Sequence, residues 1–249
     1  MTVTLEQFDS DATFVADNIS VALTGVKAGS LLVVFIGMEG TDAQGLTVAD
    51  GTHTYEIVER TLNATTDGSG NYELEAAIAY VLAADAGDYT ITVTHSGGSY
   101  VAAHVREFST GESGFSFVDS AGDYGGDNAP NSGAVTGSGE VAVGGTTDWS
   151  SGTGMTDAEI PDNTDTDDEI ATGATHDLSG SRIASLTDPE FTSTESGSQE
   201  WVSVIALFDE VAGGGDIIEE PGAGSLALAG KVPGLQTAFK IDVPTGPLW

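Results

Sequence analysis

The side chains best suited to chemistry in this sequence are four histidines and 39 carboxylates. A serine hydrolase would present its nucleophile in a Gly-x-Ser-x-Gly turn with a histidine beside it, and the sequence has no such turn. The histidines lie in unrelated contexts, and no two have the short spacing typical of zinc ligands; they are His53, His95, His104 and His176. We therefore expect ordinary strand or turn histidines, no catalytic residue and no enzymatic activity.

A dense acidic run over residues 162–169 is the best candidate for a metal site. Closely spaced carboxylates are the hard oxygen ligands that Ca²⁺ prefers, and the candidate ligands are Asp162, Asp165, Asp167 and Asp168. The run lacks the central glycine and the terminal glutamate of an EF-hand loop. A solvated acidic loop is the alternative interpretation, and no cofactor is expected.

Aromatic side chains give one candidate for glycan contact. Paired carboxylates, as glycosidases use them, occur anywhere in a chain this acidic and therefore decide nothing. Trp149, in a segment rich in glycine, serine and threonine, is the best candidate for stacking on a sugar. Trp201 opens an apolar strand and is predicted to be buried.

Charge limits the possible partners. Six basic residues face 39 acidic ones, which gives a formal charge of -33. Such like charge destabilises a compact state at low salt, whereas about 1 M salt shortens the Debye length to about 3 Å and screens most of it. The excess resembles proteins of extreme halophiles and their viruses; an ordinary acidic surface protein or a marine phage protein is the alternative. Nucleic acid and anionic membranes are not expected as partners.

The compartment is only weakly constrained. The sequence has no cysteine, so disulfides and thiolate metal sites are excluded. The first residues lack the basic and apolar regions of a signal peptide, and the longest apolar run, residues 31–36, is too short to span a membrane. No membrane association is expected.

Strand patterns predict an all-β fold, a jelly-roll-like β-sandwich with long acidic loops and an extended C-terminal tail. The 30–37 run is apolar throughout, as in a strand buried on both faces. Ser96-Gly-Gly-Ser99 predicts a hairpin between two strands. The predicted strands of the first half are 18–24, 30–37, 53–61, 72–82, 88–95 and 100–108.

The second half echoes the first. Segments 136–144 and 196–208 resemble 27–35 and 96–108, so we expect two similar β-halves, about 1–112 and 113–210, in one sandwich over 1–210. The strand over 201–208 is apolar on both faces and must be covered on each side. Residues 119–168 are predicted to form surface loops.

Composition changes after residue 210. Residues 211–224 are predicted to form a glycine-rich linker, and 225–249 an apolar tail that anchors on a partner. The anchoring side chains would be Leu226, Leu228, Val232, Leu235, Phe239, Ile241, Val243, Leu248 and Trp249.

Several segments together resemble a β-sandwich domain common in structural proteins of tailed viruses. They are Ala28-Gly-Ser-Leu-Leu-Val-Val-Phe-Ile-Gly37, Gly51-Thr-His-Thr-Tyr55, Glu75-Ala-Ala-Ile-Ala-Tyr-Val-Leu82 and Gly87-Asp-Tyr-Thr-Ile-Thr-Val-Thr94. The segment over 221–233 is similar to a Pro/Gly-bounded repeat at the ends of such proteins. The resemblance implies a virion component on the head surface or tail: a capsid decoration or turret-like protein, or a tail-fibre or glycan-binding adhesin. Its partners would be the major capsid protein or neighbouring virion proteins, and we expect a homo-oligomer.

Overall fold

The computed structural model describes residues 3–14, 18–63, 73–111, 114–148, 155–160, 177–195 and 200–211. These residues form β-strands and connections, with no helix among them, and every strand pair is antiparallel. The all-β prediction is confirmed. Residues Met1–Gly213 belong to one compact unit.

The first half of the chain builds sheet A, in the order β1-β6-β3-β5-β4, with β2 also pairing with β6. Its strands are β1 (Thr4–Phe14), β2 (Asn18–Val26), β3 (Ser30–Ala49), β4 (Glu56–Asn63), β5 (Glu73–Ala84) and β6 (Gly87–Ser109).

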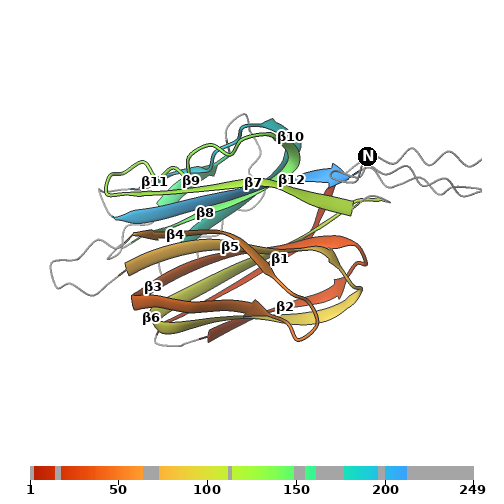
Figure 1. Cartoon of the computed structure of the whole chain (residues 1–249), viewed down its shortest axis with the longest axis horizontal. Helices are drawn as coiled ribbons and strands as arrows, with labels where there is room; N and C mark the ends of the chain where they lie inside the picture. The colour runs from red at the N-terminus through yellow and green to blue at the C-terminus, as the bar shows by residue number, and fades with distance from the viewer. Residues whose placement is uncertain are drawn as a thin grey trace, which may run out of the picture. The chain divides into compact units, whose positions relative to one another are not determined.

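The second half builds sheet B, in the order β10-β8-β12-β7, and a two-stranded sheet of β9 and β11. Figure 1 shows the strands of sheet B stacked over those of sheet A. The strands are β7 (Gly114–Gly125), β8 (Ser138–Asp148), β9 (Met155–Glu159), β10 (Asp177–Thr187), β11 (Thr192–Glu195) and β12 (Trp201–Val211).

The predicted hairpin at residues 96–99 is wrong, because β6 runs continuously from Gly87 to Ser109. Its first half pairs with β2 and with the end of β3, and its second half pairs with β1 and the start of β3. β3 accompanies β6 along both halves, with register shifts between Glu39 and Thr47. Gly97 and Gly98 therefore lie within a continuous strand whose pairing with β3 is irregular, and the chain does not reverse direction there.

Sheet A folds over on itself around its own core. Ile91 and Val93 from the first half of β6 share one apolar cluster with Val101 and Val105 from its second half. β2 contributes Ile19, Val21 and Leu23 to the same cluster. The alternate burial of β2, with every second residue exposed, follows from this one-sided packing.

A second apolar core lies between sheets A and B. Its side chains approach the backbone of β8 most closely where that strand has two consecutive glycines, Gly144 and Gly145. Val33 and Phe35 of β3 meet Val143 of β8 and Val204 of β12 in this cluster. A Cβ on Gly145 would lie 2.5 Å from the Phe35 ring, and one on Gly144 would lie 2.6 Å from Phe191 on the opposite face. The glycine pair lets two phenylalanines close on one strand from both sides.

The outer face of sheet B is covered as well. Ile205 and Leu207 of β12 pack with Phe191, Val135 and Ile160 from the connections over that face. Because Val204 and Phe208 face the other core, β12 is buried on both sides over residues 201–208. The predictions of covered faces for this strand and for β3 are confirmed.

Other strand predictions differ in extent. The predicted strand over 53–61 begins at Glu56, since residues 50–55 form a turn. The expectation of loops throughout 119–168 is wrong: β7 reaches Gly125, and β8 and β9 lie in this interval. Its glycines and aspartates have low strand propensity, and pairing with β12 and β10 overrides it.

The two echoed segments lie on strands with equivalent neighbours. The 27–35 segment runs into β3 and the 96–108 segment lies in β6, and these strands pair, with Leu31 opposite Phe108. Their counterparts run into β8 and β12, which pair with Val141 opposite Phe208. Each half of the chain therefore places its echoed pair at the centre of its own sheet.

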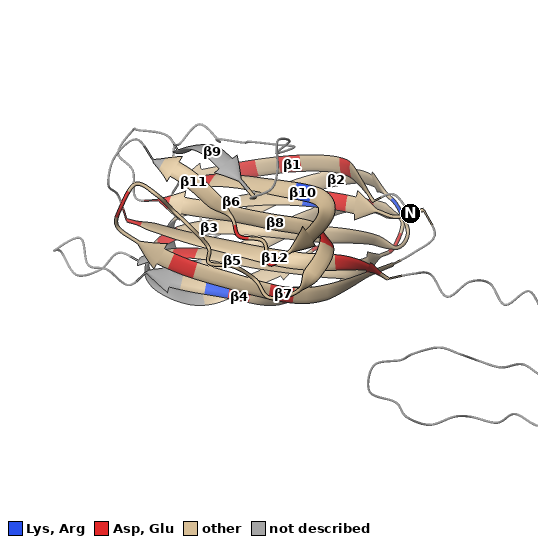
Figure 2. Cartoon of the chain, turned by 90° about the horizontal axis from the view of Figure 1, so that it is seen from above, with Lys and Arg blue, Asp and Glu red and all other residues tan. Residues whose placement is uncertain are grey.

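Charged side chains are distributed unevenly by sign. Figure 2 shows acidic positions on many strands and connections, among few basic ones. The basic residues of the described part are Lys27, Arg60, Arg106 and Arg182.

Candidate functional site

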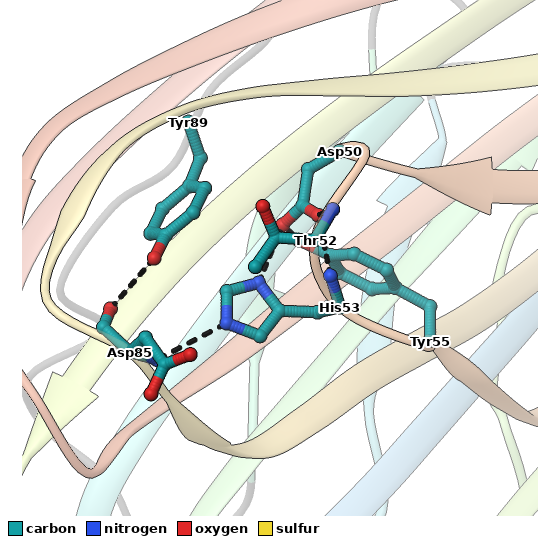
Figure 3. Close-up of polar contacts among 6 residues, drawn as sticks. All are labelled: Asp50, Thr52, His53, Tyr55, Asp85 and Tyr89. Atoms are coloured by element: carbon teal, nitrogen blue, oxygen red, sulfur yellow. Dashed lines mark hydrogen bonds and ion pairs between the residues drawn. The ribbon is translucent and has the colours of Figure 1, made fainter.

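Two clusters of polar side chains in the described residues combine residue types that can do chemistry. The rim cluster lies at the β3–β4 and β5–β6 connections and consists of Asp50, Thr52, His53, Tyr55, Asp85 and Tyr89 (Figure 3). The interlayer cluster lies between sheets A and B and consists of Tyr100, His104, Arg106, Asp177 and Ser179.

The rim cluster starts from a turn capped by Asp50. Its Oδ1 accepts the backbone N–H groups of Thr52 and His53, both at 2.8 Å, which is the geometry of an aspartate that caps its own turn. Gly51 has φ of 82°, a left-handed conformation that favours glycine. The turn formed by Asp50-Gly-Thr-His53 therefore places the His53 imidazole next to the Asp50 carboxylate.

Both ring nitrogens of His53 are engaged. Nδ1 lies 2.7 Å from Asp50 Oδ2, and Nε2 accepts the backbone N–H of Asp85 at 3.0 Å. Because Nε2 must be the acceptor, the neutral ring carries its proton on Nδ1 and donates it to Asp50. An aspartate–histidine pair in this tautomer resembles the arrangement that activates a nucleophile. Here, however, the nitrogen that would serve as base holds the β5–β6 connection (Figure 3).

Two tyrosines complete the rim cluster. Tyr55 donates to Asp50 Oδ2 at 3.1 Å, and Tyr89 donates to the Asp85 carbonyl at 3.0 Å and meets the His53 ring edge to face. Burial, and then the Asp50 charge, raise the pKa of Tyr55, so it stays a neutral donor. Burial tends to raise the pKa of Asp50, but hydrogen bonds from His53 and Thr52 outweigh it and lower that pKa.

The interlayer cluster depends on sheet packing and not on local sequence. Tyr100, His104 and Arg106 alternate along β6 and so face the same side, toward sheet B. Asp177 and Ser179 alternate on β10 in the same way. Tyr100 donates a hydrogen bond to Asp177, and Arg106 Nη2 donates to the Ser179 carbonyl at 3.1 Å.

His104 and Ser179 form a buried pair in this cluster. Ser179 Oγ lies 2.7 Å from His104 Nδ1, and both residues are fully buried. Burial, and then the neighbouring Arg106 charge, lower the pKa of His104 to about 3. Phe35 meets the ring edge to face, and Phe8 lies 4.7 Å from the Arg106 guanidinium. A serine next to a neutral histidine is a nucleophile–base pair in composition, yet apolar rings and both sheets enclose it.

The site residues predicted from the sequence lie outside the part of the chain that can be compared. Trp149, Asp162, Asp165, Asp167, Asp168 and all nine anchoring residues of the tail, Leu226 to Trp249, are beyond the described residues. Within the described ranges, no group of three or more histidine, aspartate or glutamate side chains could hold a metal ion. Nor does this part of the chain contain a helix long and apolar enough to cross a membrane.

Sequence reasoning missed both polar clusters. The signal for the rim cluster was present: an aspartate, a glycine and a histidine three residues after the aspartate form a recognisable turn. The interlayer cluster had only a weak signal: Tyr100, His104 and Arg106 lie on one face of β6, at even-numbered positions of a strand whose sequence also contains Glu107.

Comparison with protein-family models, with curated proteins and with solved structures found no match for this chain. What the geometry itself defines is an antiparallel all-β protein whose polar clusters connect strands.

Proposed function

We propose that this protein is a non-enzymatic structural component of a virion, a capsid decoration or turret-like protein of a tailed virus that infects a halophile. In this proposal the body is a jelly-roll-like sandwich whose acidic loops face the solvent. The tail over 225–249 anchors it on the major capsid protein or on a neighbouring copy.

The observation that supports a structural role most directly is how the chemically capable side chains are used. Both nitrogens of His53 hold turns together, and the Ser179–His104 pair is enclosed between sheets. A catalytic base needs a free lone pair within reach of a substrate. The polar groups in these clusters instead connect β3–β4 to β5–β6, and β6 to β10.

The copy number of the protein in purified particles tests the proposal. Quantitative mass spectrometry against the major capsid protein should give a number on the scale of the capsid lattice. A few copies per particle would instead favour a tail or fibre component. Absence from particles would overturn the virion assignment.

The anchoring role of the tail has its own test. A chain that lacks residues 221–249 should remain folded, because the apolar cores lie within residues 3–211. It should no longer attach to particles stripped of the protein. Attachment at wild-type occupancy would contradict the anchor.

The salt adaptation is tested on the protein alone. With a charge of -33, the thermal midpoint should rise steeply with KCl from low to molar concentration, since added salt screens the repulsion. A midpoint that does not change over this range would overturn the halophilic assignment.

One observation favours a tail-fibre or glycan-binding adhesin as the second candidate. Tyr124 near the end of β7 is 54% exposed, and Asp123 and Asp127 are exposed beside it. Exposed aromatic rings next to carboxylates can stack on sugars and accept their hydroxyl groups. Binding on a glycan array that is lost in Tyr124→Ala and kept in Ile57→Ala would support this role.

A further inference from the structure

The outer face of three paired strand segments carries hydroxyl groups and no charge. β2 from Asn18 to Ala22, β6 from Thr90 to Thr94 and β3 from Thr47 to Ala49 lie side by side, with β6 in the centre. We call the outward-facing residues of these segments the hydroxyl face. Its polar residues are Asn18, Ser20, Thr47, Thr90, Thr92 and Thr94.

The register of the strands places these side chains on one side of the sheet. Ser20 of β2 and Ala49 of β3 both lie opposite Thr92 of β6, and residues directly opposite each other in a ladder share a face. Ser20 Oγ lies 2.9 Å from Thr92 Oγ1. The alternate residues point the other way, and Val21 and Val93 are buried in the core of sheet A. The hydroxyl face is therefore open to the solvent, while its reverse side is packed.

The absence of charge distinguishes this face from other outward-facing strands. β1 exposes Asp9, β4 exposes Glu56 and β7 exposes Asp123. On β6 itself, Asp88 lies two residues before the first threonine of the face, and its Oδ1 accepts the backbone N–H of Gly25 at 2.7 Å. Asp88 thus lies at the end of the hydroxyl face, and no acidic residue of the described part lies within it.

We propose that the hydroxyl face binds the same face of a second copy of this chain. Two chains that each carry a formal charge of -33 repel, so they approach at the least cost where neither presents a carboxylate. A hydroxyl group both donates and accepts hydrogen bonds, so the face is complementary to itself, as a two-fold contact requires. A basic partner would instead favour the carboxylates of β1, β4 and β7.

The size of the face sets the strength of the contact. Three strands about 4.8 Å apart, each with about five residues, give a surface roughly 15 Å on each side. This is smaller than the interface of a stable dimer, so the association is weak and reversible. Because the acidic parts of the two copies still repel, the association strengthens as salt screens that repulsion.

Sedimentation equilibrium of the full chain at 0.5 M and 2 M KCl tests the contact. Wild-type protein should self-associate at both salt concentrations, and more strongly at 2 M. Thr92→Glu places a carboxylate at the centre of the face in both copies and should raise the dissociation constant at 0.5 M KCl about tenfold or more. Ala22→Glu, at an exposed position of β2, should act in the same way and covers the case of a Thr92→Glu chain that fails to fold.

The matched control is Thr187→Glu. Thr187 is exposed on β10, outside the hydroxyl face, and the substitution adds the same charge to the chain. It should change the dissociation constant much less than Thr92→Glu or Ala22→Glu does.

Four results would overturn the contact. They are a monomeric wild-type chain at the highest concentration, folded Thr92→Glu and Ala22→Glu chains that associate like wild type, an equal loss in Thr187→Glu, and wild-type association that disappears at 2 M KCl. The last result would mean that charged pairs hold the copies together. The contact does not depend on the virion assignment, because it is measured in solution without particles.

Discussion

The rim cluster and the interlayer cluster use similar side chains in opposite ways. In the rim cluster, Asp50 and His53 are three residues apart and meet through a turn. In the interlayer cluster, His104 and Ser179 are 75 residues apart and meet because two sheets pack. The first is a property of a local sequence, and the second is a property of the whole fold.

The difference extends to how well each histidine is satisfied. Both nitrogens of His53 have partners, whereas Nε2 of His104 is buried and no described residue hydrogen-bonds to it. A neutral ring tolerates this environment better than a charged one. The interlayer cluster should therefore make folding sensitive to acid, and the rim cluster should mainly fix turns.

The largest expected effect is acid destabilisation through His104. Its pKa falls from 6.5 to about 3 on folding, so the unfolded chain binds an extra proton between those pH values. Stability should be full above pH 6.5 and should fall by about 1.4 kcal/mol per pH unit below it, roughly 4–5 kcal/mol by pH 3. Urea unfolding at several pH values in molar KCl measures this slope.

Variants separate the two histidines. His104→Gln can still meet Ser179 and should lose this part of the slope, whereas His53→Gln should keep it. The difference between the slopes of wild type and His104→Gln isolates His104, whereas His53→Gln also removes a hydrogen bond that lowers the pKa of Asp50. Equal slopes in wild type and His104→Gln would show that the interlayer histidine does not couple to pH.

The second effect concerns the fit between the sheets at the interlayer cluster. An added Cβ on Gly37 would overlap the Asp177 carboxylate, which lies directly over that glycine. Gly37→Ala should therefore force the sheets apart and lower the free energy of unfolding by about 3 kcal/mol. Gly111→Ala is the control, because nothing lies within 4 Å of its added Cβ. Similar urea midpoints for the two variants would contradict the close approach.

The same contrast between local sequence and packing of distant strands decides which parts of the fold could be predicted. The 30–37 and 201–208 runs predicted strands with two covered faces. In a strand, successive side chains point to opposite faces, so a continuous apolar run requires both faces to be buried. The 96–99 segment predicted a hairpin from glycine and serine alone, but pairing with the full length of β3 keeps β6 extended. The residues around 96–99 do not indicate that β3, about 50 residues earlier in the chain, pairs with this segment.

The polar clusters follow the same rule. The rim turn was readable in Asp50-Gly-Thr-His53, although the acceptor role of Nε2 needs the β5–β6 connection. The contact of Ser179 with His104 could not be read from sequence, since nothing near either residue specifies which strands face each other across the core.

The third effect tests the rim cluster itself. Asp50→Ala removes the acceptor of two backbone N–H groups, the His53 ring and the Tyr55 hydroxyl, and should cost about 1–2 kcal/mol. Asp9→Ala removes an exposed aspartate that, among the described residues, accepts only from its neighbour Ser10, so it should change stability little. Amide exchange should accelerate at Thr52, His53 and Asp85 in Asp50→Ala. Unchanged protection at Asp85 would mean that His53 holds its place without the carboxylate.

The smallest effect is expected at a surface ion pair that belongs to neither cluster. Lys27, whose side chain is 57% exposed, lies 2.5 Å from Glu6, and the hydrogen bonds from Lys27 and then Ser109 lower the pKa of Glu6. Solvent screens such a pair, so Lys27→Met should cost at most about 0.5 kcal/mol at 0.1 M KCl and nothing measurable at 2 M. The comparison of urea midpoints at both salt concentrations measures this difference. A loss that persists at 2 M KCl would mean that the lysine stabilises the protein through the packing of its aliphatic stem, and charge would then be the lesser part of its role.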